Sequence, residues 1–241
     1  MVDSRILVVT PTYNERPNIG SFITQLFEAL PQAHCLIVDD NSPDGTGELA
    51  EELAAKDPRV RVIHRPRKLG LGSAYLQAFE RGLQDGYDVL IEMDADHSHN
   101  PRYLPGMLAE LDSRADLIIG SRNIAGGGVD GWGFGRHVLS KGGSLYSRML
   151  LGVSPRDLTS GYKIFRREVL EAIDLQTVRS EGYSFQIELT YRAIRKGFTV
   201  REFPIVFVDR HAGKSKMSRR VFAEAVMLVP KLRVEALLGR I

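Results

Sequence analysis

The chain has 241 residues, of which 43% are hydrophobic and 26% are charged. This is ordinary globular composition with enough apolar material for a sizeable core. The 32 basic and 30 acidic residues leave a formal net charge of +2, which argues against a general nucleic-acid-binding protein.

The single cysteine, Cys35, excludes an intramolecular disulfide and favours a reducing compartment. It lies in the apolar run 35–38, so we expect a buried structural thiol rather than a nucleophile. Residues 1–5 show no signal-peptide pattern, and no apolar run approaches the roughly 20 residues that cross a bilayer. We therefore expect a cytoplasmic or peripheral protein without a transmembrane domain.

Short β-favouring runs alternate with amphipathic helical patterns through residue 120. The predicted strands are 6–10, 35–38, 60–63, 89–93 and 116–120. The helical patterns carry Ile19 to Leu30, Leu49 to Leu53, the segment from Gly70 to about Gly82, and Leu104 to Leu111. This alternation predicts an α/β fold with a mostly parallel sheet, right-handed crossovers and helices on its faces. Without a repeat or low-complexity linker, we expect one domain over residues 1–241.

The second half begins with a glycine-dense loop at 126–135 that holds the sole tryptophan, Trp132. We expect a helix over 138–150, a strand at 162–165 and another helix from 183 to about 197. Residues 198–208 contain Pro204 and predict an edge or bent strand. A basic loop at 209–216 precedes a helical region at 216–241, which Pro230 should divide into two shorter helices.

The buried strand at 89–93 ends in two carboxylates, Asp94 and Asp96. Ligands of open α/β sheets collect at the carboxyl ends of strands, so these acids stand where a ligand is expected. Two hard oxygen ligands there suit Mg²⁺ or Mn²⁺, with phosphate oxygens and water completing the shell. An isolated Asp-Ala-Asp triplet is also compatible with a solvated turn, so the surrounding motifs decide between the two interpretations.

Other predicted strands also end in acids: Glu15 follows the first strand, and Asp40 follows the second. Like charges gathered at one sheet edge repel unless a cation or hydrogen-bond donors offset them. A nucleotide supplies donors, and a metal ion supplies positive charge. Basic residues that suit phosphates occur on later loops, at Arg122, Arg210, Lys214 and Lys216. The combination suggests a metal-dependent nucleotide-sugar transferase.

Three segments in the first half, 11–15, 39–46 and 94–96, resemble the successive signatures of family 2 glycosyltransferases with the GT-A fold. Three more, 120–122, 161–166 and 207–216, narrow the resemblance to dolichol- or polyprenol-phosphate mannosyltransferases, over roughly residues 5–220. The resemblance implies transfer of mannose from GDP-mannose to a polyprenyl (dolichyl) monophosphate, with inversion at the anomeric carbon.

The resemblance also assigns site residues. It implies nucleotide-sugar binding by Pro11, Tyr13, Glu15, Val38, Asp40, Asp94, Ala95, Asp96, Arg122, Arg210 and Lys216. Asp94, Asp96, Arg122, Arg210 and Lys216 are the expected catalytic residues. Asp94 and Asp96 are the expected metal ligands, and Ser98 occupies a position where some members have a glutamine ligand.

Several roles can be weighed on chemistry. Asp40 suits the adjacent N–H groups of guanine, whereas Asp44 suits helix capping. His97 and His99 are expected to be surface residues, because hard divalent ions prefer oxygen ligands. The Gly70-Leu71-Gly72 segment resembles part of a phosphate-binding loop, but helix entry explains it better. A phosphate monoester acceptor is already anionic, so the reaction needs no general base.

Two other functions remain open: a polyprenyl-phosphate glucosyltransferase that uses UDP-glucose, and a noncatalytic nucleotide-sugar-binding subunit. The lipid acceptor that the resemblance implies would bring the chain to the cytoplasmic face of a membrane, where we expect it to be peripherally associated. The glycine-rich loop and the following helix are expected on the lipid-facing side, with core packing of Trp132 as the alternative. Residues 217–241 fit either a basic amphipathic membrane contact or packing on the domain. Whether a separate membrane-anchoring protein is needed stays open.

Overall fold

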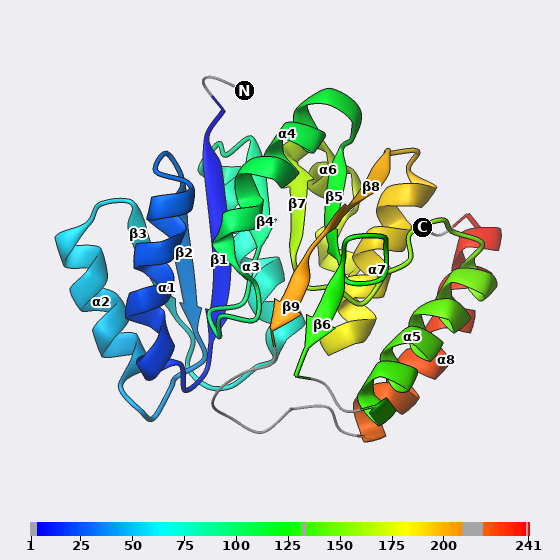
Figure 1. Ribbon diagram of the computed structural model, residues 1–241, viewed down its shortest axis with the longest axis horizontal. Coiled ribbons are helices and arrows are strands. Elements are labelled where there is room, and N and C mark those ends of the chain that lie inside the picture. The colour runs from blue at the N-terminus through cyan, green and yellow to red at the C-terminus, as the bar shows by residue number, and fades with distance from the viewer. Residues whose placement is uncertain (1–3, 132–133, 209–218, 240) are drawn as a thin grey trace.

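The computed structural model describes residues 4–131, 134–208, 219–239 and 241, without the side chains of 112–114, 134–139 and 219–226. Within these residues the chain forms a seven-stranded sheet, β3-β2-β1-β4-β7-β5-β8, and a two-stranded sheet, β6-β9 (Figure 1). The strands are β1 (Ile6–Thr12), β2 (His34–Asp39), β3 (Val60–His64), β4 (Val89–Glu92), β5 (Leu117–Ser121), β6 (Gly128–Asp130), β7 (Lys163–Arg166), β8 (Val200–Pro204) and β9 (Val206–Val208). The α-helices are α1 (Arg16–Ala29), α2 (Thr46–Lys56), α3 (Leu71–Gln84), α4 (Leu104–Arg114), α5 (Phe134–Leu151), α6 (Arg167–Ala172), α7 (Gly182–Arg195) and α8 (Arg219–Leu237).

The large sheet is mostly parallel, as the alternating pattern predicts. β1 lies between β2 and β4 and is parallel to both, while β2 pairs in parallel with β3 and β5 with β8. β7 runs antiparallel between β4 and β5. The predicted α/β fold is therefore confirmed, with one antiparallel strand inserted into its centre.

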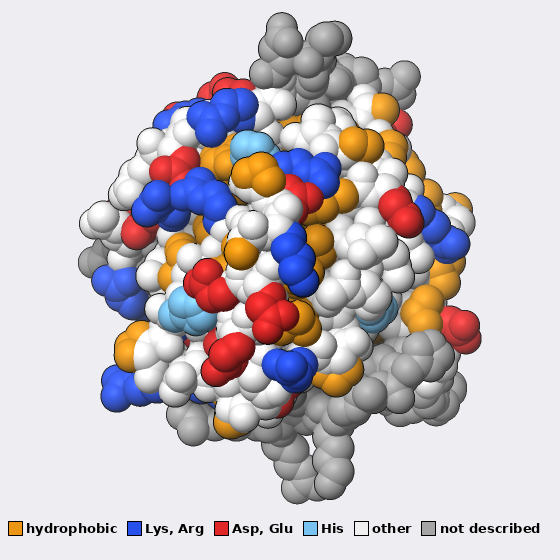
Figure 2. Space-filling view, turned by 90° about the vertical axis from the view of Figure 1, so that its left-hand side faces the viewer, with side chains coloured by type: hydrophobic (Ala, Val, Ile, Leu, Met, Phe, Trp, Pro, Cys, Tyr) orange, Lys and Arg blue, Asp and Glu red, His pale blue; other side chains and the backbone are white. Residues whose placement is uncertain are grey.

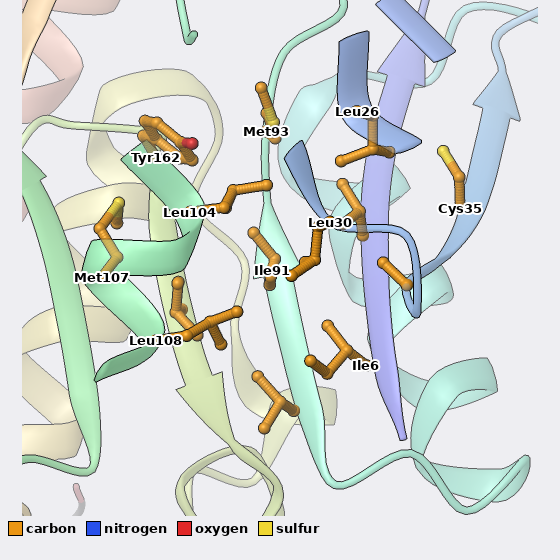
Figure 3. Close-up of a cluster of buried hydrophobic side chains, with 14 of the residues drawn as sticks. Ile6, Leu26, Leu30, Cys35, Ile91, Met93, Leu104, Met107, Leu108 and Tyr162 are labelled. Carbon is orange, nitrogen blue, oxygen red and sulfur yellow. The ribbon is translucent and has the colours of Figure 1, made fainter. Parts of the chain in front are cut away.

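Helices bury apolar side chains on both faces of this sheet. Phe22 of α1 and Leu104 of α4 belong to the cluster on one face, which Figure 3 shows from close by. Phe79 of α3 and Phe185 of α7 belong to the cluster on the other face. Because successive strand residues point to opposite faces, a strand covered on both sides is apolar throughout. This explains the continuous hydrophobic runs of β1, β2 and β5.

A third hydrophobic cluster joins α5, α7 and α8 at one side of the molecule. Its buried members are Leu151, Leu158, Ile187, Tyr191, Val229, Leu232 and Ala236. Figure 1 shows α5 and α8 side by side there, away from the strands. No helix in the described part of the chain is long and apolar enough to cross a membrane.

The expectation that Pro230 divides the C-terminal region into two helices is wrong. Residues Arg219–Leu237 form one helix, with Pro230 inside it. The proline removes one backbone hydrogen bond, but Val229 and Leu232 on either side of it are buried in the third cluster. Tertiary packing thus outweighs a local helix-breaking signal that is stronger in an isolated peptide.

The predicted loop at 126–135 contains a strand that the sequence analysis did not identify. β6 pairs in parallel with β9, with Val129 opposite Phe207. The segment 198–208 is confirmed as bent, because β8 ends at Pro204 on the edge of the large sheet and β9 continues in the small one. Trp132 lies outside the described residues.

Two smaller expectations are also resolved. Cys35 is fully buried in β2, and burial raises the pKa of its thiol, as a structural cysteine requires. Gly70 precedes α3 with φ of +105°, and an added Cβ there would lie 2.6 Å from Glu181 Oε2, so the glycines provide helix entry.

Figure 2 shows acidic, basic and hydrophobic side chains interspersed on the side formed by α2 and β3.

Candidate active site

The candidate site lies at the carboxyl ends of β1, β2 and β4. β1 is flanked by β2 on one side and β4 on the other, so the chain connections leave in opposite directions at this point. Such a switch point leaves a crevice between adjacent loops in an open sheet. The topology therefore brings together the predicted loops at 11–15, 39–46 and 94–100.

Hydrogen bonds join the loop after β1 to the loop after β2. Thr12 Oγ1 donates to Asp39 Oδ1 at 3.0 Å, and the Asn14 N–H donates to Ser42 Oγ at 3.0 Å. The Glu15 N–H donates to Thr46 Oγ1 at 2.9 Å. These bonds place the predicted binding residues of the two loops next to each other. Pro11, Tyr13 and Glu15 are partly exposed, whereas Val38, which pairs with Pro11 across the strands, is buried.

Asp40 is buried and carries an ion pair that the sequence analysis missed. Its Oδ1 lies 2.8 Å from Arg65 Nη1, and its Oδ2 accepts bonds from the Leu69 and Gly70 N–H groups at 3.3 and 3.4 Å. Lys68, in the same segment, places its ammonium 3.8 Å from the Tyr13 ring centroid. Asp40 is thus held in a fixed orientation beside the loop that carries Tyr13.

The two acids after β4 have different surroundings. Asp94 is partly exposed, and its Oδ1 accepts a bond from the Tyr75 hydroxyl at 3.2 Å. Asp96 is buried, and its Oδ1 accepts bonds from the Ser98 N–H at 3.0 Å and the Ser98 hydroxyl at 2.5 Å. Ala95 between them is buried. Ser98 therefore orients the carboxylate of Asp96.

The end of β4 is a region of concentrated negative charge. Burial raises the pKa of Tyr75 well above its usual value, and the carboxylates of Asp94, Glu92 and Asp96 raise it further. Burial also raises the pKa of Glu92, which lies opposite Lys163 of β7. Because the raised pKa favours the neutral form of Glu92, the negative charge comes mainly from Asp94 and Asp96, two neighbouring carboxylates that favour a divalent cation.

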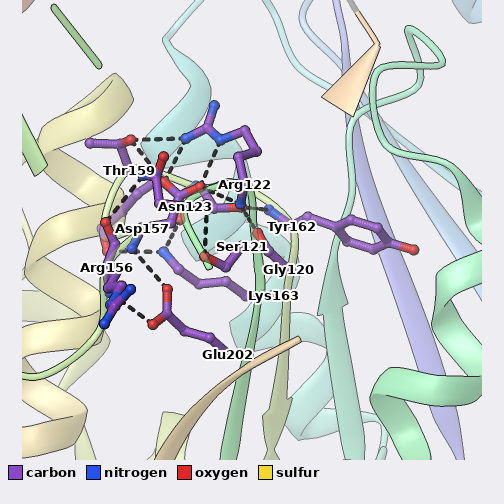
Figure 4. A network of polar contacts seen from close by, with 12 residues as sticks. Gly120, Ser121, Arg122, Asn123, Arg156, Asp157, Thr159, Tyr162, Lys163 and Glu202 are labelled. Atoms are coloured by element: carbon purple, nitrogen blue, oxygen red, sulfur yellow. Dashed lines mark hydrogen bonds and ion pairs between the residues drawn. The ribbon is translucent and has the colours of Figure 1, made fainter. Parts of the chain in front are cut away.

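Arg122, directly after β5, is held by a buried aspartate (Figure 4). Its Nε and Nη2 donate to the two oxygens of Asp157 at 2.7 and 2.6 Å, and its backbone N–H donates to Asp157 Oδ2 at 2.9 Å. Nη2 also donates to Thr159 Oγ1 at 3.0 Å. The pair is therefore a buried, bidentate ion pair and not a salt bridge on the protein surface.

The residues after β4 fit a divalent metal ion in their chemistry. Asp94, Asp96 and Ser98 offer oxygen atoms only, which suit Mg²⁺ or Mn²⁺. Among the described residues there is no group of three or more acid, histidine or cysteine side chains arranged as a metal cage. Such a site suits an ion that shares its coordination shell with phosphate oxygens and water.

The expectation for His99 is wrong, since its side chain is 3% exposed rather than on the surface. Its Nδ1 accepts a hydrogen bond from the Asp94 N–H at 3.1 Å. His97 is partly exposed and lies 2.9 Å from Ser21 Oγ. His99 can bond to Asp94, five residues before it, only because the loop between them turns back. The sequence spacing alone does not reveal this turn.

The predicted basic loop cannot be placed, because Arg210, Lys214 and Lys216 lie outside the described residues. β9 ends at Val208, immediately before this loop. Phe207 of β9 lies near both sides of the site: its ring centroid is 5.6 Å from that of His99 and 5.4 Å from Arg122 Cζ.

The sheet order and the acidic loops at its switch point define an α/β protein of the GT-A type. The family model described as glycosyl transferase family 2 matches residues 7–174. The chain therefore belongs to glycosyl transferase family 2 and is a glycosyltransferase.

Two curated relatives are similar over nearly the whole chain. The polyprenol monophosphomannose synthase of Mycolicibacterium smegmatis is 54% identical over 237 residues, covering 98% of this chain and 89% of the relative. The undecaprenyl-phosphate mannosyltransferase of Micrococcus luteus is 48% identical over 227 residues, covering 94% of this chain and 93% of the relative.

Solved structures share the fold at lower identity. Glucosyl-3-phosphoglycerate synthase from Mycobacterium tuberculosis, in complex with Mn²⁺, UDP and glucosyl-3-phosphoglycerate, gives a TM-score of 0.66 at 20% identity, covering 99% of this chain and 80% of that one. A mannosyltransferase from Pyrobaculum calidifontis, in complex with GDP-Man and Mn²⁺, gives a TM-score of 0.59 at 15% identity. The match covers 98% of this chain and 74% of that one. Both likenesses support the expected GT-A-like fold.

Proposed function

We propose that this chain transfers mannose from GDP-mannose to a polyprenyl monophosphate and releases GDP. The observation that carries this proposal is the meeting of Asp94 and Asp96 with the Tyr13 and Asp40 loops at one switch point. The 54% identity to a polyprenol monophosphomannose synthase supports the choice of sugar and acceptor.

The donor nucleotide would lie over the carboxyl ends of β1 and β2. Pro11, Tyr13, Glu15 and the Val38 backbone would line its base and ribose. Asp40 would accept the adjacent N–H groups of guanine, and its fixed orientation between Arg65 and the Leu69 and Gly70 amides supports this role. The mannosyltransferase from Pyrobaculum calidifontis, in complex with GDP-Man, supports a guanosine donor in this fold.

Asp94 and Asp96 would hold a divalent ion, Mg²⁺ or Mn²⁺, with Ala95 between them in contact with the donor. When bound, this ion supplies Lewis-acid neutralisation of the diphosphate leaving group. Ser98 keeps Asp96 oriented through two hydrogen bonds and is the proposed third oxygen ligand. The Mn²⁺ complexes of two structural neighbours support a metal-dependent reaction.

The acceptor phosphate attacks the anomeric carbon from the face opposite the diphosphate. The new bond joins a phosphate oxygen to C1 as the bond from C1 to the β-phosphate breaks, which inverts α-mannose to a β-mannosyl phosphate. The acceptor is anionic near neutral pH, so no residue has to remove a proton. Arg122, fixed by Asp157, and Arg210 with Lys216 on the following loop would offset repulsion between the two phosphate groups.

The lipid acceptor requires contact with a membrane surface, which we propose for the paired helices α5 and α8. We call the exposed apolar residues of these helices, together with Leu238 directly after α8, the α5/α8 face; they are Leu145, Tyr146, Met149, Leu150, Met227, Val234, Leu237 and Leu238. Lys141 and Lys231 are exposed on the same two helices and suit anionic headgroups. This arrangement supports a peripheral position, which we propose to be on the cytoplasmic leaflet; a separate membrane-anchoring protein stays an open alternative.

One assay separates this function from its alternatives. Protein, Mg²⁺ and a short polyprenyl phosphate are incubated with labelled GDP-mannose or, separately, with UDP-glucose. We expect a mannolipid only from GDP-mannose, a β-linkage by NMR, and no product with EDTA. Glucose transfer from UDP-glucose would replace the proposal with a glucosyltransferase. Tight GDP-mannose binding without any turnover would instead indicate a noncatalytic subunit.

A further inference from the structure

His99 is bonded to the backbone of the acidic loop at the point where β4 stops pairing. The Met93 N–H still donates to the Val9 carbonyl of β1, at 3.2 Å. The next N–H, that of Asp94, donates instead to His99 Nδ1 at 3.1 Å. This bond requires the tautomer that carries its proton on Nε2. The His99 side chain therefore takes the place of a neighbouring strand as the hydrogen-bond acceptor for the first N–H after the last ladder bond, that of Asp94.

The loop between Asp94 and His99 turns back on itself to make this bond. His97 adopts a left-handed backbone conformation with φ of +63°, which is unfavourable for a residue other than glycine. Within the loop, Ser98 donates to Asp96 through both its N–H and its hydroxyl. A different residue thus orients each acid: His99 fixes the backbone of Asp94 through one bond, and Ser98 fixes the carboxylate of Asp96 through two.

Aromatic contacts hold the imidazole of His99 from two other strands. The Tyr162 ring, directly before β7, stacks on it with centroids 5.0 Å apart and an interplanar angle of 21°. The Phe207 ring of β9 meets it edge-on, at 5.6 Å and 74°. The Tyr162 hydroxyl also donates to the Asn100 carbonyl at 3.1 Å. The ring is therefore fixed on two sides, which restricts the direction in which Nδ1 points.

We propose that His99 is a positioning residue that sets the backbone of Asp94 for metal and donor binding; the role in binding rests on the function proposed above. Its ring also connects the acidic loop with Phe207, which lies beside Arg122 and directly before the basic loop. In this proposal His99 acts through the backbone of Asp94 and is not assigned a catalytic role of its own. Removing its acceptor leaves the partly buried Asp94 N–H without that partner, and the loop can relax to another conformation.

Three variants test the bond separately from the ring. His99→Phe keeps an aromatic ring but has no acceptor. His99→Asn loses the ring but has an oxygen at the same bond separation from Cβ as Nδ1. His97→Asn is the matched control, because it removes the neighbouring imidazole and asparagine tolerates positive φ. Circular dichroism and melting temperature report whether each variant folds.

The readouts are Mn²⁺ affinity in the presence of GDP, measured by electron paramagnetic resonance, and hydrogen exchange of the Asp94 amide in the metal-free protein. We expect Mn²⁺ affinity to fall about tenfold or more in His99→Phe, the loss typical of a residue that orients a metal ligand. His99→Asn and His97→Asn should keep most of the affinity. The Asp94 amide should be protected in the unaltered protein and in His99→Asn, but not in His99→Phe.

Two results would overturn the proposal: rapid exchange of the Asp94 amide in the folded unaltered protein, or unchanged Mn²⁺ affinity in folded His99→Phe. The exchange measurement needs neither metal nor donor. An absence of mannose transfer would therefore count against the proposed function alone, while the exchange result would still decide whether His99 holds Asp94.

Discussion

Asp94 and Asp96 are one residue apart, yet their surroundings assign them different tasks. Asp94 is partly exposed, and its Oδ1 accepts a hydrogen bond from the Tyr75 hydroxyl, so its carboxylate stays partly accessible to solvent. Asp96 is buried, and its Oδ1 accepts hydrogen bonds from the N–H and the hydroxyl of Ser98. A negative charge held this deeply is favoured by a nearby cation.

We predict that Asp96→Asn lowers kcat/KM for mannose transfer on the order of 100-fold or more, because an amide is a poor ligand for a hard divalent ion. The amide oxygen can still accept from Ser98, so the melting temperature should change little. Steady-state kinetics with Mg²⁺ and thermal unfolding check both parts. Glu52→Gln on the exposed side of α2 is the control. Near-normal Mg²⁺-dependent activity of Asp96→Asn would contradict the metal assignment.

The buried Arg122–Asp157 pair predicts a pH dependence of stability. Burial alone would raise the pKa of Asp157, but the charge of Arg122 and the hydrogen bonds that Asp157 accepts lower it overall. The unfolded chain therefore takes up this proton at a higher pH than the folded protein. The pair stabilises the fold above about pH 4, the usual Asp pKa, and this stabilisation is lost as the pH falls through the folded-state pKa.

Asp157→Asn should therefore lower the free energy of unfolding at pH 7 by about 3 kcal/mol, since it leaves Arg122 buried without its counter-charge. Below the folded-state pKa of Asp157 the difference from the unaltered protein should shrink. Urea unfolding at pH 7 and at low pH measures it, with the exposed residue Asp174 changed to Asn as control. An equal deficit at both pH values would show that the charge pair does not cause it.

At the scale of elements, the sequence predicted the helices and strands that depend on residues close together in the chain. The alternation of apolar strands and amphipathic helices through residue 120 predicted the mostly parallel sheet, and Pro204 predicted the bend after β8. The antiparallel position of β7 inside the sheet was not predicted. β6 was missed because Gly128–Asp130 becomes a strand only by pairing with β9, far along the chain. The continuous α8 was missed because its buried partners lie on α5 and α7.

The same distinction holds for the site. Acids at strand ends could be found from their spacing, and the topology brings their loops together. The partners that hold the site residues could not be found, because Arg65 pairs with Asp40 and Asp157 with Arg122 across loops. A buried charge demands a counter-charge, but sequence alone does not say which of many candidates supplies it.

The strand β9 leads directly into the loop that carries Arg210 and Lys216. We predict that Arg210→Ala and Lys216→Ala each lower kcat/KM for transfer by about 100-fold, the cost of removing one group that offsets developing phosphate charge. The melting temperature should stay nearly unchanged. Lys196→Ala, at an exposed position after α7, is the control. Unchanged transfer kinetics in both loop variants would exclude a phosphate-binding role.

At the scale of the whole molecule, the C-terminal region combines both alternatives that its sequence left open. Val229, Leu232 and Ala236 of α8 pack inward, whereas Met227, Val234 and Leu237 are exposed. Deleting residues 231–241 would reduce membrane binding but also remove buried side chains. Substitutions on the α5/α8 face therefore test membrane contact more cleanly.

We predict weak, salt-sensitive binding to vesicles that contain anionic lipid, reduced by Met149→Glu and by Met227→Glu. Each change adds one negative charge to an exposed apolar position, 76% and 77% accessible respectively. Gln25→Glu adds the same charge to an exposed position on α1 and should bind as the unaltered protein does. Sedimentation with vesicles measures all four proteins. Equal binding by all four proteins would show that the α5/α8 face is not the membrane contact.

The assignment of residues 1–241 to one catalytic domain also stays a prediction.

The position of Cys35 makes the molecule its own reporter of ligand binding. The chain has a single cysteine, which is fully buried near the start of β2, so an aromatic disulfide reagent reaches it only when the fold opens. A ligand that binds only the closed form slows labelling by the factor by which it stabilises that form, about 100-fold at 100 times its Kd. The reaction of Cys35 releases a coloured aromatic thiolate from the reagent. The rate of this colour change would then rank nucleotides and metal ions by affinity, without any lipid substrate.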